Sequence, residues 1–334
     1  MSPRAESSVS ALGAVYGGVA RLRRSWYDRR PASRIRLSRP VISVGNIVTG
    51  GSGKTPVVAA VAAVLSRLGH RPAILSRGYG RSRLAPAMVV VTEGTGPLVP
   101  VEQSGDEPQM LARDIRGVPI IVAADRVRAG QAAIDRFDST VLILDDGFQH
   151  LRLERTIDLL VLSSADLAEK LLPSGRLREP LSAASAADAV LAYGSAAEAQ
   201  QLAGRVGVEQ SFCVTPRYLP LLTLHGVLPA ADKRVAAVAG IARPQRFFDA
   251  LRKQGYDIVR EFTFADHHWF SAADVRDIEA KVRELGVSAV VTTAKDAMRL
   301  ERHRNALTSP WAILPLSVFV EPSAEFEAWL VSRL

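Results

Sequence analysis

The sequence predicts an α/β protein with a large parallel-sheet domain, a second, smaller α/β domain and an N-terminal amphipathic helix. Apolar runs of about five residues alternate with longer helical patterns through most of the chain, which is typical of a parallel sheet covered by helices. A connection at 215–234, rich in proline and turn residues, divides this alternation into two sets. Apolar residues at helical spacing, followed by arginines, open the chain.

The first set of candidate strands precedes this connection. The strands are expected at 41–45, 72–76, 87–91, 119–123, 140–144, 157–162 and 188–192. Helical patterns at 54–69, 107–116 and 126–137 lie between several of them. Because helices separate successive strands, we expect the strands to run parallel.

The second set follows Pro229 and is shorter. It comprises candidate strands at 235–239, 257–262 and 287–293 and helices at 244–254 and 271–285. A further strand is expected at 311–320 and a closing helix at 323–334. We therefore divide the chain into an amphipathic helix (1–36), a sheet domain (37–214), a second α/β domain (215–310) and a segment that returns to the core (311–334). A cleft is expected between the two α/β lobes.

The composition is that of a globular protein with a basic surface. Of the 334 residues, 48% are hydrophobic and 23% charged, and the net charge is +8. This charge favours anionic partners without selecting among nucleic acid, an acidic membrane and a phosphorylated substrate. The single cysteine, Cys213, excludes an internal disulfide and favours a reducing, cytosolic setting.

Residues 9–30 are expected to form a helix with one apolar side. That side comprises Leu12, Val15, Tyr16, Val19, Leu22 and Trp26, and the arginines near its end are Arg21, Arg23, Arg24, Arg29 and Arg30. A signal peptide has its charges before its apolar stretch, which is the reverse order. No apolar run reaches the roughly 18–20 residues of a membrane span. A helix in the membrane interface and a surface helix packed on the protein's own core both fit.

A glycine-rich loop follows the first strand in the stretch SVGNIVTGGSGKTP, residues 43–56. Backbone amides from Gly50 to Gly53, including Gly51 and Ser52, are expected to bind phosphate at the start of a helix. Lys54 is expected to reach the β- and γ-phosphates, and Thr55 to hold magnesium. Val48 occupies the position where the pattern G-x-x-x-x-G-K-[ST] has its first glycine. The glycines that face the phosphates all follow it, so the stretch still predicts a P-loop NTPase-type domain.

A second motif supports this prediction. The apolar run VLILDDGFQH, residues 141–150, ends in Asp145 and Asp146. Carboxylates at the end of a strand near the loop are what a magnesium-bound nucleotide requires. Together, the two motifs predict a P-loop NTPase or kinase.

The motifs favour a kinase over a GTPase switch. A GTPase normally has an Asn-Lys-x-Asp element, whereas TAKDA at 293–297 has lysine and aspartate adjacent. A kinase needs a general base near the γ-phosphate. Candidates lie in SGDEPQMLA, with Asp106 and Glu107, and in FADHHWF, with His267 and His268. Taken alone, the acids also fit a helix start and the histidines a structural role.

These motifs together resemble the tetraacyldisaccharide 4'-kinase family of lipid A biosynthesis. The resemblance rests on SVGNIVTGGSGKTP, SRGYGR, GDEP, DDGFQHLRL, LLPSGRLREP, AGIARPQRFF, FADHHWF and VTTAKDA, in the family's order. The family also has valine at the position of Val48. Ala242-Arg243-Pro244 and Ala294 depart from its usual pattern, which bears on nucleotide-base contacts and lobe closure.

The resemblance implies a role for each matching residue. Lys54 and Thr55 would bind ATP phosphates and Mg²⁺, Asp106 would be the general base, and His267 would be its partner from the second lobe. The remaining assignments are Glu107, Asp145 and Asp146 as magnesium or outer carboxylates, Gln149, Arg178 and Glu179 as substrate-side residues, and Arg126 and Arg128 as contacts to the anionic disaccharide.

The activity implied by the resemblance is γ-phosphate transfer from ATP to the 4'-hydroxyl of a tetraacylated glucosamine disaccharide 1-phosphate. The enzyme would be a peripheral, monotopic protein on the cytoplasmic face of the inner membrane, held by the helix at 9–30. One alternative is a P-loop GTPase or metallochaperone. Another is a nucleic-acid-binding ATPase, which only the positive net charge supports. Because the sequence contains no recognised nucleic-acid-binding module, we expect no nucleic-acid partner.

Overall fold

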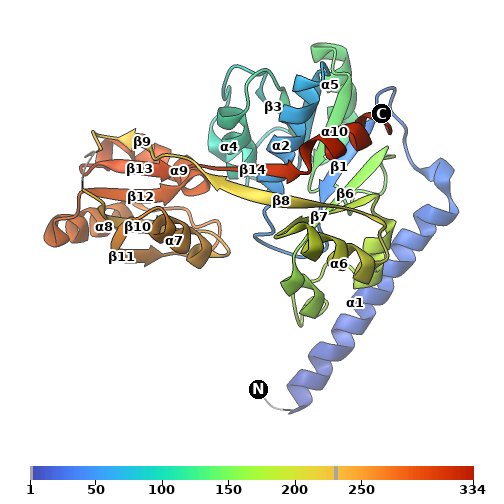
Figure 1. Ribbon diagram of the computed structural model, residues 1–334, viewed down its shortest axis with the longest axis horizontal. Helices are drawn as coiled ribbons and strands as arrows, with labels where there is room; N and C mark the ends of the chain where they lie inside the picture. The colour runs from blue at the N-terminus through green and yellow to red at the C-terminus, as the bar shows by residue number, and fades with distance from the viewer. Residues whose placement is uncertain (1–2, 229–231) are drawn as a thin grey trace.

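The computed structural model describes residues 3–228 and 232–334, so residues 229–231 of the expected connection and residues 1–2 lie outside it. Within the described residues, the strands form a nine-stranded and a five-stranded sheet (Figure 1). We call the larger sheet with its helices the large lobe, and the smaller sheet with its helices the second lobe.

The large sheet has the strand order β14-β8-β7-β6-β1-β5-β2-β4-β3. The edge strands β14 and β3 run antiparallel to their neighbours, and the other neighbours run parallel. The strands are β1 (Val41–Gly45), β2 (Pro72–Ser76), β3 (Met88–Thr92), β4 (Ile120–Ala123), β5 (Val141–Asp145), β6 (Ile157–Leu162), β7 (Ala189–Tyr193), β8 (Gln210–Tyr218) and β14 (Leu316–Glu321).

Helices cover both faces of this sheet. Side chains alternate between faces along a strand, so in β5 Ile143 packs in one core with α2, α4 and α10, whereas Leu142 packs in another with α5. The helices of this lobe are α2 (Lys54–Arg67), α3 (Val101–Ser104), α4 (Asp106–Asp114), α5 (Arg126–Phe137), α6 (Ala196–Val206) and α10 (Ser323–Val331). The short 3-10 helices are η1 (Pro31–Ser33), η2 (Ser164–Ala168), η3 (Leu181–Ala186) and, in the second lobe, η4 (Glu301–Ala306).

The second sheet has the order β11-β10-β12-β13-β9, with only β9 antiparallel to its neighbour among the described strands. Its strands are β9 (Leu222–His225), β10 (Arg234–Ala239), β11 (Asp257–Thr263), β12 (Ala289–Thr293) and β13 (Trp311–Leu314). Helix α7 (Pro244–Lys253) packs on one face, and α8 (Ala272–Leu285) with α9 (Ala294–Leu300) on the other.

Helix α1 (Pro3–Arg29) lies along the large lobe, and the second lobe lies at the other end of the molecule (Figure 1). Small and polar residues make its described contacts. A Cβ on Gly17 would be 2.6 Å from Leu171, and the buried Arg24 pairs with Glu179. The apolar side is exposed, for example 66% at Val15 and 71% at Leu22, so it does not pack on the protein's own core. Among the described residues, none of the helices has the length and apolar content to span a bilayer.

The structure corrects the expected strand at 311–320. Pro315, which cannot donate a backbone hydrogen bond, separates β13 from β14, and these strands belong to different sheets. Residues 311–314 therefore lie in the second sheet, and only the chain after Pro315 returns to the large lobe. The expected connection at 215–234 was also incomplete, because β8 continues through Tyr218 and β9 follows it.

Candidate active site

A glycine-rich loop joins β1 to α2 at the carboxyl edge of the large sheet. Gly50 and Gly53 have φ angles of 74° and 80°, which glycine adopts without strain. Gly53 is the N-cap of α2, so the first amides of the helix have no partner within it. Nζ of Lys54 lies 3.1 Å from Oδ1 of Asn46 and 3.3 Å from Oγ of Ser52. Amide donors and a cation thus meet at one helix start, an arrangement that binds phosphate.

Val48, which breaks the loop pattern, lies in an apolar core. It is fully buried with Ile47, Phe148 and Leu177, and its backbone pairs with Leu177. The next residue, Thr49, donates its N–H to the carbonyl oxygen of Arg176 at 2.8 Å. A glycine is not needed here, because this position anchors the loop to the core instead of facing a phosphate.

Asp145 ends β5 beside this loop and is buried. Its Oδ2 accepts a hydrogen bond of 2.9 Å from Ser76, while its buried Oδ1 has no hydrogen-bond partner among the described residues. Burial raises the pKa of Asp145 to about 7, and the charges of Glu107 and Asp146 add to this rise. A cation bound beside Asp145 would therefore stabilise the ionised form of this carboxylate.

Asp146 has a left-handed backbone, with φ of 56°, and faces two cations. Its Oδ1 lies 3.3 Å from Nζ of Lys54, and its Oδ2 accepts a hydrogen bond of 2.6 Å from Arg178. Burial alone would raise the pKa of Asp146, but Lys54 and Arg178 lower it overall. Lys54 is thus fixed between the loop and a carboxylate that stays ionised.

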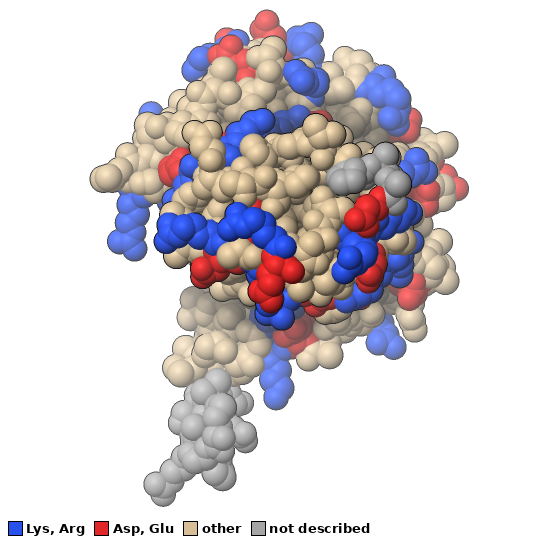
Figure 2. All heavy atoms as spheres, turned by 90° about the vertical axis from the view of Figure 1, so that its left-hand side faces the viewer, with Lys and Arg blue, Asp and Glu red and all other residues tan. Residues whose placement is uncertain are grey.

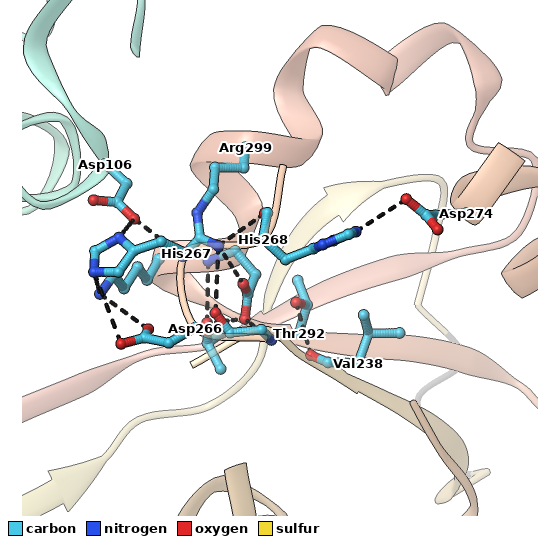
Figure 3. Close-up of polar contacts among 12 residues, drawn as sticks. Asp106, Val238, Asp266, His267, His268, Asp274, Thr292 and Arg299 are labelled. Atoms are coloured by element: carbon cyan, nitrogen blue, oxygen red, sulfur yellow. Dashed lines mark hydrogen bonds and ion pairs between the residues drawn. The ribbon is translucent and has the colours of Figure 1, made fainter. Parts of the chain in front are cut away.

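A histidine of the second lobe contacts an aspartate of the large lobe (Figure 3). Nδ1 of His267 lies 3.0 Å from Oδ2 of Asp106, the first residue of α4. His267 has a φ of 60°, a strained conformation of the kind found at functional sites. Burial would raise the pKa of Asp106, but the hydrogen bond with His267 and the charges of Lys295 and Arg299 lower it. Asp106 is therefore an ionised carboxylate held between lobes.

Lys295 of α9 completes this contact. Its Nζ donates to Oε1 of Glu107 and lies 3.1 Å from Nε2 of His267. Because an ammonium group can only donate, Nε2 accepts, and the ring proton of His267 is on Nδ1, toward Asp106. Burial lowers the pKa of Lys295, but Glu107, Asp106 and Asp266 raise it overall, so the ammonium is retained.

The lobes also meet beside the loop. A Cβ built on Gly51 would be 2.9 Å from Cβ of Ala242, and Arg243 lies 3.7 Å from the buried Asp166. These contacts and those of α9 bring both lobes to a shared cavity of about 1980 Å³. Predicted site residues that line it are Gly50, Gly51, Ser52, Gly53, Lys54, Thr55, Glu107, Asp145, Asp146, Gln149, Arg178, Glu179 and His267.

The chain is similar to known kinases along nearly its whole length. The family model for tetraacyldisaccharide-1-P 4'-kinase matches residues 6–334. The chain belongs to this family. The tetraacyldisaccharide 4'-kinase of Syntrophus aciditrophicus (strain SB) is 37% identical over 327 residues, which cover 92% of this chain and 87% of that protein. The corresponding kinase of Geobacter sulfurreducens is 38% identical over 310 residues, covering 90% of this chain and 85% of that protein.

A solved structure extends the match to the fold. The crystal structure of "apo" form LpxK from Aquifex aeolicus in complex with ATP has a TM-score of 0.78 and 28% sequence identity, and the match covers 98% of each chain. The family match favours the kinase over the GTPase or metallochaperone alternative.

Three substrate-side candidates of this kinase lie near the loop. Gln149 donates to the carbonyl oxygen of Asn46 at 2.8 Å, and Arg178 pairs with Asp146. Glu179 instead accepts a hydrogen bond of 2.8 Å from Arg24 of α1. The N-terminal helix of the kinase is thereby tied to the wall of the cavity.

The structure does not bring Arg126 or Arg128 to the cavity wall. Arg126 is buried at the start of α5, where it donates to the carbonyl oxygen of Ala124, and Arg128 is exposed on the same helix. Burial lowers the pKa of Arg126, with a further contribution from Arg77. Because the two arginines are two positions apart on α5, they lie on different sides of that helix.

Sequence reasoning missed several residues of the site. Lys295 and Arg299 lie one helical turn apart on α9, a helix that the sequence pattern did not predict, so their shared side was not recognised. Tyr193, which ends β7, donates to the carbonyl oxygen of Gly53 at 2.8 Å. No motif marks Tyr193, because only the order of strands brings it next to the loop.

The carboxylates beside the loop fit a magnesium ion. Within the described chain, no group of three or more His, Cys, Asp or Glu side chains is arranged to hold a metal by itself. Magnesium at phosphoryl-transfer sites usually takes one or two carboxylates and completes its shell with phosphate and water oxygens. The partnerless Oδ1 of Asp145 is an oxygen available for this purpose.

Proposed function

We propose that this kinase transfers the γ-phosphate of ATP to the 4'-hydroxyl of a tetraacylated glucosamine disaccharide 1-phosphate in lipid A biosynthesis. The observation that carries this proposal is the contact of the buried Asp106 with His267, which lines a cavity together with the phosphate-binding loop. A base held against a residue of the cavity wall, with the phosphate loop on the same cavity in a chain of this family, suits transfer to a hydroxyl better than hydrolysis.

The loop residues position and neutralise the triphosphate. Amides at the start of α2 and the ammonium of Lys54 bind the phosphate oxygens, and Asp146 keeps Lys54 in place. Thr55, Asp145 and Asp146 would hold Mg²⁺, which when bound neutralises charge that develops on the phosphates. Glu107 is already paired with Lys295, so it acts on this metal site through its charge.

Asp106 accepts the proton of the acceptor hydroxyl. It is ionised, and the Nδ1–H of His267 orients it. Because phosphoryl transfer passes through a largely dissociative transition state, the main demand on the base is position, which a weakly basic but fixed carboxylate meets. The lobes must be in contact for this, since the loop and Asp106 belong to one lobe and His267 to the other.

Substrate-side roles are proposed for Gln149, Arg178 and Glu179, which line the cavity between the loop and α1. Tyr16 and Val19 of α1 line the same cavity. An acylated sugar entering there would have its sugar near the loop and its acyl chains along α1. Arg126 is buried, and we assign it an electrostatic role, because its charge interacts with those of Asp145 and Asp146. Arg128 is not proposed as a substrate contact.

We also propose that α1 holds the kinase on the cytoplasmic face of the inner membrane as a peripheral, monotopic protein. Its exposed apolar side and the neighbouring arginines fit the interface of an anionic bilayer. No nucleic-acid partner is proposed. On the face of the second lobe turned to the viewer in Figure 2, Lys and Arg side chains are interspersed with Asp and Glu.

The proposed function is tested by transfer of labelled γ-phosphate from ATP to tetraacyldisaccharide 1-phosphate in detergent micelles. We expect label in the lipid, lost in Lys54→Ala. ATP consumption without lipid labelling would contradict the acceptor, and equal labelling by Lys54→Ala would contradict the role of the loop. Omitting Mg²⁺, with EDTA present, is expected to abolish transfer and to weaken ATP binding measured by calorimetry.

A further inference from the structure

The guanidinium of Arg299 is buried in the second lobe, with 1% of the residue exposed. Its Nη1 donates to the carbonyl oxygens of His268 at 2.9 Å and Gly240 at 3.3 Å. Nη1 also lies 3.4 Å from Oδ1 of Asp296, a carboxylate that the hydroxyl of Thr293 fixes. The second lobe thus holds the guanidinium by one of its nitrogens.

The remaining nitrogens do not serve the second lobe. Nη2 lies 3.0 Å from Oδ2 of Asp106, across the boundary between lobes, and Figure 3 shows this pair beside His267. In the described part of the chain, neither Nε nor Nη2 of Arg299 has a hydrogen-bond partner. A buried cation with unmatched donors destabilises the lobe that contains it, and such groups call for a functional reason. The ion pair with Asp106 is that reason.

The contacts on Asp106 are divided unequally between its two oxygens. Oδ2 faces Nδ1 of His267 and Nη2 of Arg299, both from the second lobe. Oδ1 accepts a hydrogen bond only from the amide of Glu107 among the described residues, at 2.9 Å. A carboxylate has about four acceptor positions. The position left free is therefore on Oδ1.

We propose that Arg299 is a positioning residue that, together with His267, fixes Oδ2 of Asp106 when the lobes meet and so leaves Oδ1 to the acceptor hydroxyl. This rests on the proposed function, in which Asp106 is the base. In the transfer step, the hydroxyl O–H bond breaks and its proton goes to Oδ1. The oxygen's electron pair forms the new bond to the γ-phosphorus, and the bond from that phosphorus to the bridging oxygen breaks to release ADP. Arg299 acts through Asp106 and touches neither reactant.

Without the second lobe, Oδ2 of Asp106 would lose the contacts with His267 and Arg299, and only the hydrogen bond from the amide of Glu107 to Oδ1 would hold the carboxylate. Correct placement of Oδ1 for proton acceptance would therefore depend on contact between the lobes. Lys295, four residues earlier on α9, pairs with Glu107 in the same way. One helix of the second lobe thus engages the first two acids of α4.

The test is a double-mutant cycle with Asp106→Asn, Arg299→Met and the combined variant, assayed for kcat and for the KM of ATP with the lipid acceptor. We expect Arg299→Met to lower kcat about 100-fold, the loss typical of a misplaced reacting group. The KM for ATP should stay unchanged, because Arg299 does not contact the loop. In the Asp106→Asn background, Arg299→Met should cause no further loss. Arg299→Lys keeps the positive charge but not the planar guanidinium with its paired N–H donors, so it should lower kcat about tenfold.

The control is Arg155→Met. Arg155 is a similarly buried cation, paired with Asp158 at 2.8 Å in the large lobe. We expect it to lower thermal stability without changing kcat of the folded protein. If Arg299→Met lowers kcat by the same factor in the parent and in Asp106→Asn, Arg299 is merely structural and the proposal is overturned. Full turnover by Arg299→Met, with turnover by Asp106→Asn impaired, would also overturn the proposal. Full turnover by Asp106→Asn would instead overturn the proposed base and this inference together. If Arg299→Met does not fold, Arg299→Lys completes the same cycle.

Discussion

The hydroxyl of Tyr193 donates a hydrogen bond of 2.8 Å to the carbonyl oxygen of Gly53, the residue directly before Lys54. A Cβ on Gly53 would be 2.5 Å from this hydroxyl oxygen, so the ring and the loop are in close contact. Burial raises the pKa of Tyr193, which keeps the hydroxyl protonated as a donor. β7 thereby supports the loop from the side opposite the Asp145–Asp146 pair, since β7 and β5 lie on opposite sides of β1.

Replacing Tyr193 by Phe removes this hydrogen bond and keeps the ring. A net hydrogen bond contributes about 1 kcal/mol, so we expect the Kd for ATP to rise about fivefold in isothermal titration calorimetry. Tyr218→Phe is the matched control, since Tyr218 lines the same cavity without a hydrogen bond to the loop in the described chain. Equal ATP affinity of Tyr193→Phe and the parent protein would show that the ring alone supports the loop.

Gly51→Ala is expected to hinder contact between lobes. The added Cβ would lie 2.9 Å from Cβ of Ala242, so the second lobe must move away. Because misplacement lowers the rate of transfer, we expect kcat to fall by about tenfold or more while ATP still binds. Ala242→Gly in the same chain should restore turnover. If Ala242→Gly does not raise kcat of the Gly51→Ala variant, the defect lies in the loop itself and not in contact between the lobes.

His150→Gln is expected to flatten the dependence of stability on pH. Burial, followed by Arg126 and Arg155, lowers the pKa of His150 from 6.5 to about 4. Between these values the unfolded chain binds a proton that the folded chain does not, so stability falls as pH falls from 6.5 to 4.

Urea unfolding at pH 7.5 and pH 5 measures this effect. The parent should lose about 1–2 kcal/mol more than His150→Gln over this interval, a value reduced from the full shift because the ring is partly exposed. Above pH 6.5 the two curves should run parallel. If the free energy of unfolding of the parent and of His150→Gln depends on pH with the same slope throughout, the lowered pKa of His150 is contradicted.

Val15→Ser combined with Leu22→Ser is expected to release the kinase from anionic vesicles. Each side chain is largely exposed, and burying such a group in lipid contributes about 1.5–3 kcal/mol, so partitioning of the double variant should fall at least about 100-fold. Leu84→Ser is the control, because Leu84 is 96% exposed in a loop remote from α1 in sequence. Similar losses from the control and the double variant in vesicle sedimentation would exclude α1 as the contact.

The features that the sequence predicts well are those with local signals. Strand β1, the glycine-rich loop and α2 follow one another within 41–67, and the aspartates end a strand of continuous apolar residues. Asp106 and His267 were named through the family resemblance, and the structure places them 3.0 Å apart. Their catalytic roles stay predictions.

The features that the sequence did not predict depend on contacts between distant segments. Pro315 is one of 19 prolines, and nothing local indicates that the chain changes sheets there. Nothing local in TAKDA indicates that the ammonium of its lysine contacts Glu107, 188 positions away. The resemblance implied that Arg126 and Arg128 contact the anionic disaccharide, and the motif does not reveal that Arg126 is buried.

The ion pair of Arg24 with Glu179 joins α1 to the large lobe, which also carries the loop. On a membrane bound through α1, the large lobe is therefore the stationary part of the enzyme. Any separation of the lobes then swings the second lobe, with His267 and Arg299, through the aqueous side. Under the proposed attachment through α1, an acceptor bound between the loop and α1 would stay at the lipid surface while the second lobe moves.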